Sequence, residues 1–221
     1  MGKRREGWYH SDMPSGAARL VVIFWGANDA ATLGQLPFLQ GLPLDEYQLN
    51  LKQMIASIRE CGNRDFQTPT EVILVTPPPV DDQCWLAERK QTFKAFNTNA
   101  TEEEVGAVSL DRTNEITRTY AAALRSVAQE VKCPLVDLYE SMQASSEGES
   151  SDVPHRKYFS DGLHFSEAGN DFMFRALRKT IKQHLPTLTP FTIEKGTFHV
   201  VPDSWCSLLQ SQTSVSGVML L

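Results

Sequence analysis

Three short predicted strands constrain the fold of this chain most strongly. They lie at residues 20–25, 71–76 and 133–138. The first reads Leu-Val-Val-Ile-Phe-Trp, and a run that is apolar throughout and rich in β-branched residues is typical of a strand buried on both faces. Apolar residues recur at helical spacing in 45–61, 112–131 and 166–185. This alternation of strands and helices predicts an α/β fold with a parallel sheet.

The remaining segments surround a single predicted domain. A chain of 221 residues has the size of one domain. We divide it into an irregular N-terminal lead-in (1–18), the domain (19–185) and a C-terminal tail with weak strand-like pieces (186–221). Inside the domain, 30–43 is expected to be a loop and 143–154, rich in Ser and Glu, a mobile surface loop. The polar segment 81–107 is expected to hold one helical turn near Trp85.

Charge and the chain's first residues narrow the classes of partner and compartment. The chain carries 21 Lys and Arg against 27 Asp and Glu, a net charge of −6, which argues against non-specific binding to nucleic acid or an anionic membrane. No apolar run reaches the ~18–20 residues that span a bilayer. The basic stretch Met1 to Arg5 is not followed by the apolar part of a secretory signal, so we expect a cytoplasmic protein. The four cysteines lack the spacing of a zinc or redox motif.

The first candidate functional cluster is Gly26-Ala27-Asn28-Asp29, which directly follows the first predicted strand. Ligands of α/β sheets bind beyond the carboxyl ends of the strands. There, the backbone N–H of Gly26 and the side-chain amide of Asn28 can both donate to a carbonyl oxygen that becomes negative, which makes an oxyanion hole. The alternative is a plain turn, because Gly and Asn favour turns in any case.

The second candidate cluster begins at Asp161 and contains His164 three residues later. With Gly162 allowing a tight bend, the Asp161 carboxylate can hold the Nδ1–H of the imidazole and leave Nε2 free as a base. Ser166 is expected to cap the last helix. The alternative is that Asp161 caps a turn and His164 is a satisfied, partly buried histidine.

Taken together, the two clusters resemble a known enzyme family. The segments VVIFWGAND and DGLHFSEAG are similar to the third and fifth conserved blocks of the SGNH (GDSL-type) hydrolases, and the likeness covers about 19–185. The segments 75–80 and 43–47 are similar to the isoamyl-acetate-hydrolysing esterase branch. The resemblance implies a flavodoxin-like three-layer α/β/α sandwich that hydrolyses small carboxylic esters with no metal or organic cofactor. It also implies that Gly26 and Asn28 are oxyanion donors, His164 the general base and Asp161 its orienting acid.

One part of the family's pattern has no counterpart in this chain. The first family block, a strand followed by Gly-Asp-Ser, supplies the nucleophile and should precede the strand at 20–25, but the sequence lacks it. Ser11 and Ser15 do not follow an apolar strand, and an activated serine needs a fixed position beside its base. Cys84 lies on the expected active face, but nothing near it in the sequence lowers the pKa of its thiol. The nucleophile therefore stays unidentified.

This departure carries expectations for both folding and function. The family's first two strands lie beside the strand at 20–25, so without them we expect that strand to be an unpaired apolar edge. We interpret the chain as an N-terminally truncated form, a splice variant or an imperfect gene model of an esterase. The alternative function is a catalytically inactive α/β module that binds a ligand or a partner. The sequence leaves acyl and alcohol preference and oligomeric state open.

Overall fold

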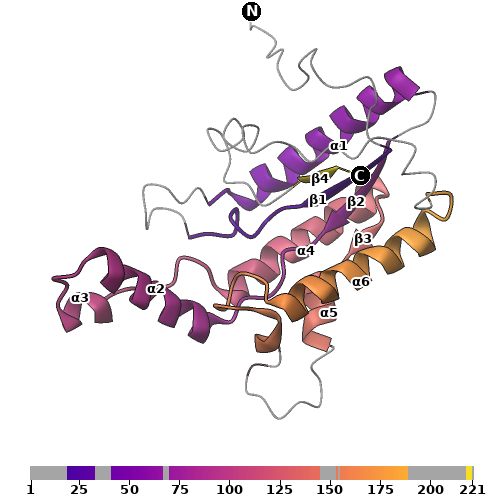
Figure 1. Ribbon diagram of the computed structural model, residues 1–221. Coiled ribbons are helices and arrows are strands. Elements are labelled where there is room, and N and C mark those ends of the chain that lie inside the picture. Colours follow the sequence, from indigo (N-terminus) through magenta and orange to yellow (C-terminus); the bar gives the residue numbers. More distant parts are fainter. Residues whose placement is uncertain are drawn as a thin grey trace, which may run out of the picture.

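One sheet forms the centre of the structure, a computed structural model that describes residues 19–32, 41–66, 70–144, 153, 155–188 and 218–220 (Figure 1). Its strands within these ranges are β1 (Leu20–Phe24), β2 (Glu71–Val75), β3 (Leu135–Val136) and β4 (Val218–Leu220). The strand order is β3-β2-β1-β4, in which β2 pairs in parallel with both β1 and β3. This parallel unit confirms the predicted α/β fold.

Helices connect the parallel strands, and three of them were expected from their periodicity. The helices within the described residues are α1 (Leu44–Phe66), α2 (Asp82–Phe96), α3 (Glu102–Gly106), α4 (Asn114–Val131), α5 (Leu138–Ala144), the 3₁₀ turn η1 (Arg156–Tyr158) and α6 (Glu167–His184). Ser166 caps α6 as predicted, because its hydroxyl accepts the backbone N–H of Gly169 at 3.2 Å. Asp45 lies inside the first turn of α1, where the positive end of the helix dipole stabilises its negative charge.

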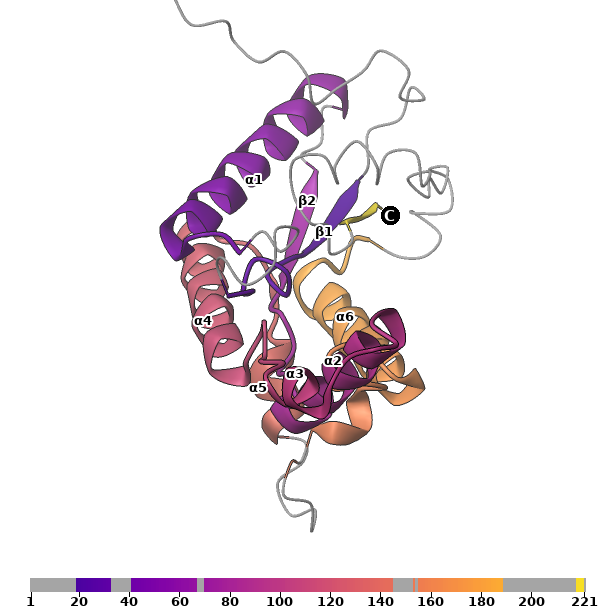
Figure 2. The ribbon, with the colours of Figure 1, turned by 90° about the vertical axis from the view of Figure 1, so that its left-hand side faces the viewer.

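The sheet is covered on both faces, which produces three layers. Alternate residues of β1 and β2 contribute to two separate apolar cores. One core joins Val21, Ile23, Val72 and Leu74 to α1 and α4, and the other joins Leu20, Val22, Ile73 and Val75 to α5 and α6. Figure 2 shows α1 and α4 on one side of the strands and α6 on the other. Because each face of β1 is buried, the strand is apolar at every position, as the sequence indicated.

Two predicted segments differ from the structure. The strand expected at 133–138 is limited to Leu135–Val136, because α5 already begins at Leu138. The segment 81–107 holds the helices α2 and α3 rather than a single turn. Helix α2 has no fully buried residue, and Figure 1 shows it projecting with α3 away from the sheet. A helix that packs so little against the core shows no apolar periodicity, which explains why the sequence did not reveal it.

The expected unpaired edge of β1 is also corrected by the structure. Strand β4 pairs with β1 in the antiparallel direction, with Val21 opposite Leu220 and Ile23 opposite Val218. A segment near the end of the chain thus satisfies backbone groups that would otherwise form an open edge. The expected lead-in 1–18, most of the loop 143–154 and the strand-like pieces at 197–201 lie outside the described residues.

We expect that removal of β4 exposes the edge of β1 with which β4 pairs. In a chain that ends at residue 217, the β1 amides that face β4 lose their partners, so they should exchange with solvent faster than in the full chain. Native-state hydrogen exchange measured residue by residue tests this. The amide of Leu74, which bonds to the carbonyl of Pro134 at 3.0 Å on the other side of the sheet, serves as internal control. Unchanged exchange throughout β1 would contradict the pairing.

Candidate active site

The turn after β1 requires glycine at its first position. Gly26 has a φ of +119°, a region that side chains of L-residues rarely enter. A Cβ atom there would lie 2.8 Å from the hydroxyl of Tyr47, which itself donates a hydrogen bond to the carbonyl of Trp25 at 3.1 Å. The turn closes when the N–H of Ala30 bonds to the carbonyl of Gly26 at 2.9 Å. The sequence Gly-Ala-Asn-Asp is thus held tightly against α1.

Asp29 shares this turn and engages one of the two expected oxyanion donors. Burial raises the pKa of the Asp29 carboxyl, and hydrogen bonds from the backbone N–H groups of Asp29 and Gly26 only partly offset that effect.

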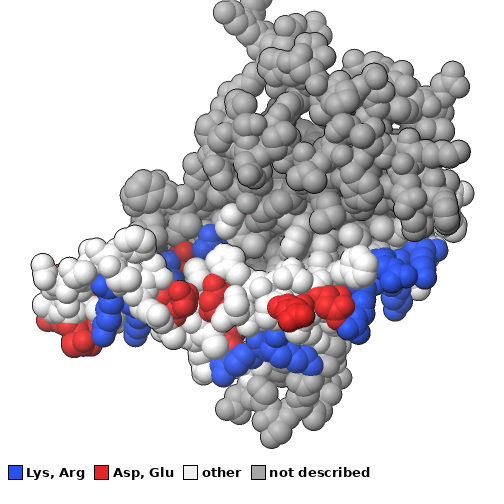
Figure 3. Space-filling model, viewed as in Figure 1, with Lys and Arg blue, Asp and Glu red and all other residues white. Residues whose placement is uncertain are grey.

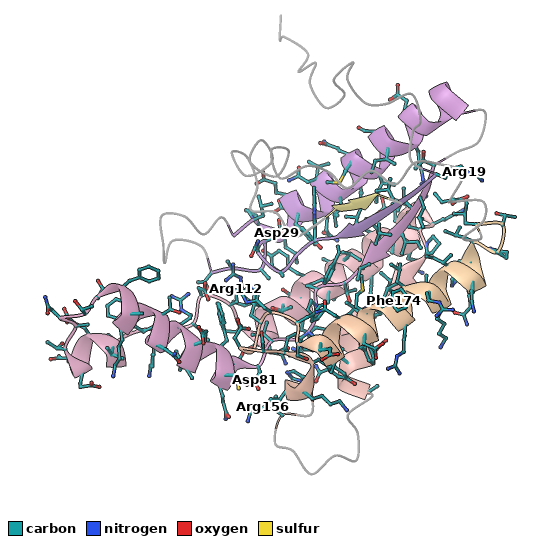
Figure 4. The ribbon with its side chains drawn as sticks, in the orientation of Figure 1. Arg19, Asp29, Asp81, Arg112, Arg156 and Phe174 are labelled. Carbon is teal, nitrogen blue, oxygen red and sulfur yellow. The ribbon has the colours of Figure 1, made fainter. Side chains whose placement is uncertain are left out.

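The Asn28 side chain is held by an arginine from a distant part of the chain. Arg112 donates from Nη2 to Oδ1 of Asn28 at 2.7 Å and from Nε to the carbonyl of Ala27 at 3.0 Å. Figure 4 shows Arg112 and Asp29 in the same region of the molecule, near the end of β1. Arg112 is buried and paired with the equally buried Asp111, whose Oδ2 lies 2.9 Å from Nη1. Among the residues that the structure describes, none accepts a hydrogen bond from the two N–H groups of the Asn28 amide, so these can serve another acceptor.

The second cluster forms the carboxylate–imidazole pair that the sequence suggested. Oδ2 of Asp161 lies 2.6 Å from Nδ1 of His164, and Oδ1 accepts the backbone N–H groups of Leu163 and His164 at 2.9 and 2.7 Å. Partial burial acts to raise the pKa of Asp161, but the hydrogen bonds from His164 and Leu163 outweigh it and hold the pKa below its ordinary value. With Nδ1 engaged, Nε2 of the 69% exposed imidazole is the nitrogen left for proton transfer.

The start of α2 positions the loop that carries this pair. The N–H of Asp81 bonds to the carbonyl of Gly162 at 2.9 Å, while the Asp81 side chain caps α2 by accepting the N–H of Cys84 at 3.1 Å. Asp81 is buried and ion-paired with Arg156, at 2.6 Å from its Nε. Gly162 has a φ of +96°, and a Cβ atom there would lie 2.6 Å from the backbone nitrogen of Trp85. The loop therefore fits α2 only with glycine at this position.

Aromatic contacts bring the two clusters to the same end of the sheet. The ring of Phe24, the last residue of β1, stacks on that of Phe165, with centroids 6.0 Å apart and planes at 15°. The Trp85 ring meets that of His164 edge-on at 6.0 Å and 76°, and its Nε1 donates to Oδ1 of Asp111 at 2.7 Å. Since Asp111 pairs with Arg112, a continuous series of contacts leads from Asn28 to the imidazole.

The residues considered as nucleophiles do not gain support. Ser11 and Ser15 lie outside the described residues. Burial raises the pKa of the Cys84 thiol, and the hydrogen bond to Asp81 with the negative charge of Asp81 raises it further, so Cys84 is not an activated thiolate. Among the residues that the structure describes, no three His, Cys, Asp or Glu side chains are grouped so as to hold a metal ion.

The sequence did not point to Trp85, Asp111 and Arg112 as part of this site. Arg112 is far from Asn28 along the chain, and an Asp-Arg pair just before a helix normally lies on a solvated surface. Burial is what distinguishes this pair, with 3% and 8% of the two side chains exposed. Burial at a helix entrance depends on long-range packing, so no local pattern could have revealed it.

We expect Gly162→Ala to destabilise the chain, because the new methyl group collides with backbone atoms of α2 and the required φ is strained. The cost should be on the order of 1–3 kcal/mol in the free energy of unfolding. The matched control is Gly106→Ala, since a Cβ atom at Gly106 meets nothing within 4 Å. Urea denaturation of both variants measures the difference. Equal stability of the two variants would contradict the docking of this loop on α2.

The lowered pKa of Asp161 predicts how stability depends on pH. A carboxyl whose pKa is lower in the folded than in the unfolded chain stabilises the fold above its unfolded pKa, close to 3.8 here, and loses that contribution as pH falls through the folded value. The wild-type chain should therefore lose more stability than Asp161→Asn between about pH 5 and pH 2. Urea denaturation across this range measures it, and parallel pH profiles for the two proteins would contradict the expectation.

The chain is similar in sequence to a family of known proteins. The GDSL-like Lipase/Acylhydrolase family model matches residues 8–177. The chain is 35% identical over 175 residues to the isoamyl acetate-hydrolyzing esterase 1 homolog of Mus musculus, covering 77% of this chain and 60% of that protein. It is 31% identical over 171 residues to the isoamyl acetate-hydrolyzing esterase of Saccharomyces cerevisiae, with the same coverage.

A solved lipase/acylhydrolase from Enterococcus faecalis is 23% identical, with a TM-score of 0.46, over 73% of this chain and 60% of that one. The chain thus spans about 60% of the length of the curated relatives it matches. The family match covers most of the chain, and it includes both candidate clusters. The chain belongs to the GDSL-like lipase/acylhydrolase family, as its resemblance to the SGNH hydrolases predicted.

Proposed function

We propose that the protein is a carboxylic ester hydrolase of the SGNH type. In this proposal His164 is the general base, Asp161 orients it, and the Asn28 amide with the N–H of Gly26 stabilises the oxyanion. The observation that carries the proposal is the 2.6 Å contact between Asp161 and Nδ1 of His164, at the end of the sheet where Arg112 holds the Asn28 amide. The nucleophile is not assigned to any residue of the chain.

The geometry supports a division of labour in acyl transfer. A nucleophilic hydroxyl attacks the acyl carbon of the ester while Nε2 of His164 takes its proton, and Asp161 stabilises the imidazolium that forms. The carbonyl oxygen becomes negative and accepts hydrogen bonds from Asn28 and Gly26. The proton then passes from His164 to the departing alcohol, and water releases the acid by the same steps.

Small acetate-like esters are the proposed substrates. Two of the matched relatives are named for the hydrolysis of isoamyl acetate. Figure 3 shows acidic and basic side chains next to one another on the described part of this face. Within the described ranges, no helix combines the length and apolar character needed to cross a bilayer. The cytoplasmic location stays a prediction.

A second candidate function is that of a non-catalytic binding module that uses the same site. The observation in its favour is that the 221 residues contain no Gly-Asp-Ser triplet, so the oxyanion donors and the base lack the family's usual nucleophile. A module of this kind would bind an ester or its acid without turning it over. It has no use for the Asp161–His164 pair, which is why we place it second.

We expect slow hydrolysis of p-nitrophenyl acetate by this chain. Without its nucleophile, a triad enzyme retains only ~10³–10⁴-fold catalysis over water, which comes from the oxyanion donors and binding. The residual rate should be unchanged in Ser11→Ala and Ser15→Ala and should fall about 10²–10³-fold in Asn28→Ala, to a rate still measurable above buffer. Initial rates measured by release of p-nitrophenol, with heat-denatured protein as control, test this.

The remaining outcomes of this assay separate the candidate functions. A rate unaffected by both Asn28→Ala and His164→Ala would exclude the proposed site. Full enzymatic turnover that His164→Ala abolishes would support the esterase but show that the chain holds its own nucleophile. Isoamyl acetate that raises the melting temperature without being hydrolysed would favour the binding module.

A further inference from the structure

The orientation of an asparagine amide decides whether it can serve as an oxyanion donor. One end of the amide is an acceptor and the other carries two N–H donors, and a half-turn of the group exchanges them. Only the orientation that presents Nδ2 to the oxyanion stabilises the negative charge that develops on it. Asn28 belongs to a short turn outside any helix or strand, so something beyond the turn has to set that orientation.

Arg112 meets this requirement because of its chemistry as well as its position. A guanidinium carries donors and no acceptor, so the group that faces Nη2 at 2.7 Å must be the oxygen of the Asn28 amide. The reversed amide would place two sets of N–H groups against each other. The second bond, from Nε to the carbonyl of Ala27 at 3.0 Å, fixes the guanidinium relative to the backbone of the same turn. Side chain and backbone are thus held by one rigid planar group.

Asp111 makes this arrangement possible and extends it across the site. Arg112 is 8% exposed, and a buried cation is tolerated only with a well-placed counter-charge, which Oδ2 of Asp111 provides at 2.9 Å. The same carboxylate receives Nη1 of Arg89 at 2.6 Å and Nε1 of Trp85 at 2.7 Å. Two arginines on one carboxylate leave the group with a net positive charge beside the Asn28 amide. Trp85 in turn meets the ring of His164 edge-on.

We propose that Arg112 is a positioning residue that holds the Asn28 amide by its oxygen and so leaves its N–H groups for the oxyanion, and that Asp111 links this constraint through Trp85 to His164. The inference rests on the proposed ester hydrolase function and names residues that act through Asn28 and His164 without touching the substrate. It predicts that the effect of Arg112 on catalysis passes through Asn28.

A double-mutant cycle tests this with p-nitrophenyl acetate. Removing one oxyanion donor costs about 10²–10³-fold in kcat, so we expect Arg112→Met to lower the residual kcat at least ~tenfold while KM stays within about twofold. Because both changes disable the same donor, the variant with Arg112→Met and Asn28→Ala should be no slower than Asn28→Ala alone. Arg112→Lys keeps the charge but not the planar fork, and we expect it to recover part of the rate. Losses that multiply would overturn the proposal.

Nuclear magnetic resonance of the Asn28 side chain gives a readout that needs no turnover. In ¹⁵N-labelled protein, Arg112→Met should shift or broaden the side-chain amide pair of Asn28, whereas Arg118→Met, which alters an exposed arginine on α4, should leave it unchanged. Asn28 signals that are the same in the wild type and Arg112→Met would overturn the proposal. If Arg112→Met does not fold, Arg112→Lys and Asp111→Asn carry the same comparison. If the amide responds but hydrolysis does not depend on Asn28, the proposed function fails while the positioning by Arg112 stands.

Discussion

Burial of β1 on both faces is the constraint on which the rest of the structure depends. Two apolar cores meet along this five-residue strand, so helices must cover both sides of the sheet. The chain then leaves the sheet at its carboxyl end through Gly26, whose positive φ turns it sharply against Tyr47. The polar residues that follow are placed at the edge where the loops after β2 also emerge. The position of Asn28 is therefore a consequence of the core, not of local preference.

The position of the loop that carries His164 depends on polar contacts as well as on packing. The loop around His164 packs Phe165 on Phe24, and it is joined to the start of α2 by the hydrogen bond from the N–H of Asp81 to the carbonyl of Gly162. Asp81 combines three tasks there, because it caps the helix, accepts Arg156 and donates its N–H to Gly162. Helix α2 has no buried residue, yet it carries Trp85, which contacts both His164 and Asp111. Polar contacts of Asp81 thus set the position of the His164 loop relative to α2.

Local patterns in the sequence predicted the parts of this structure that local physics determines. The buried strands, the helices α1, α4 and α6, and the short-range pair of Asp161 and His164 all follow from spacing along the chain. The sequence did not reveal two features that depend on partners far away along the chain. One is the hydrogen bond from Arg112 to Asn28, and the other is the pairing of β4 with β1. Helix α2 was missed for a related reason, since it lacks the buried face that makes a helix readable.

The central claim is that the two clusters lie together at one end of the sheet, and its most direct test is whether the ring contacts between them exist in solution. Nuclear Overhauser spectroscopy on protein labelled at its aromatic residues measures this through proton pairs closer than about 5–6 Å, the range of ring contacts. We predict cross-peaks between the rings of Phe24 and Phe165 and between those of Trp85 and His164. The Tyr47–Tyr120 contact in the core serves as the reference for a folded protein. A spectrum that shows this reference but neither of the other two contacts would contradict the claim that the two clusters lie together.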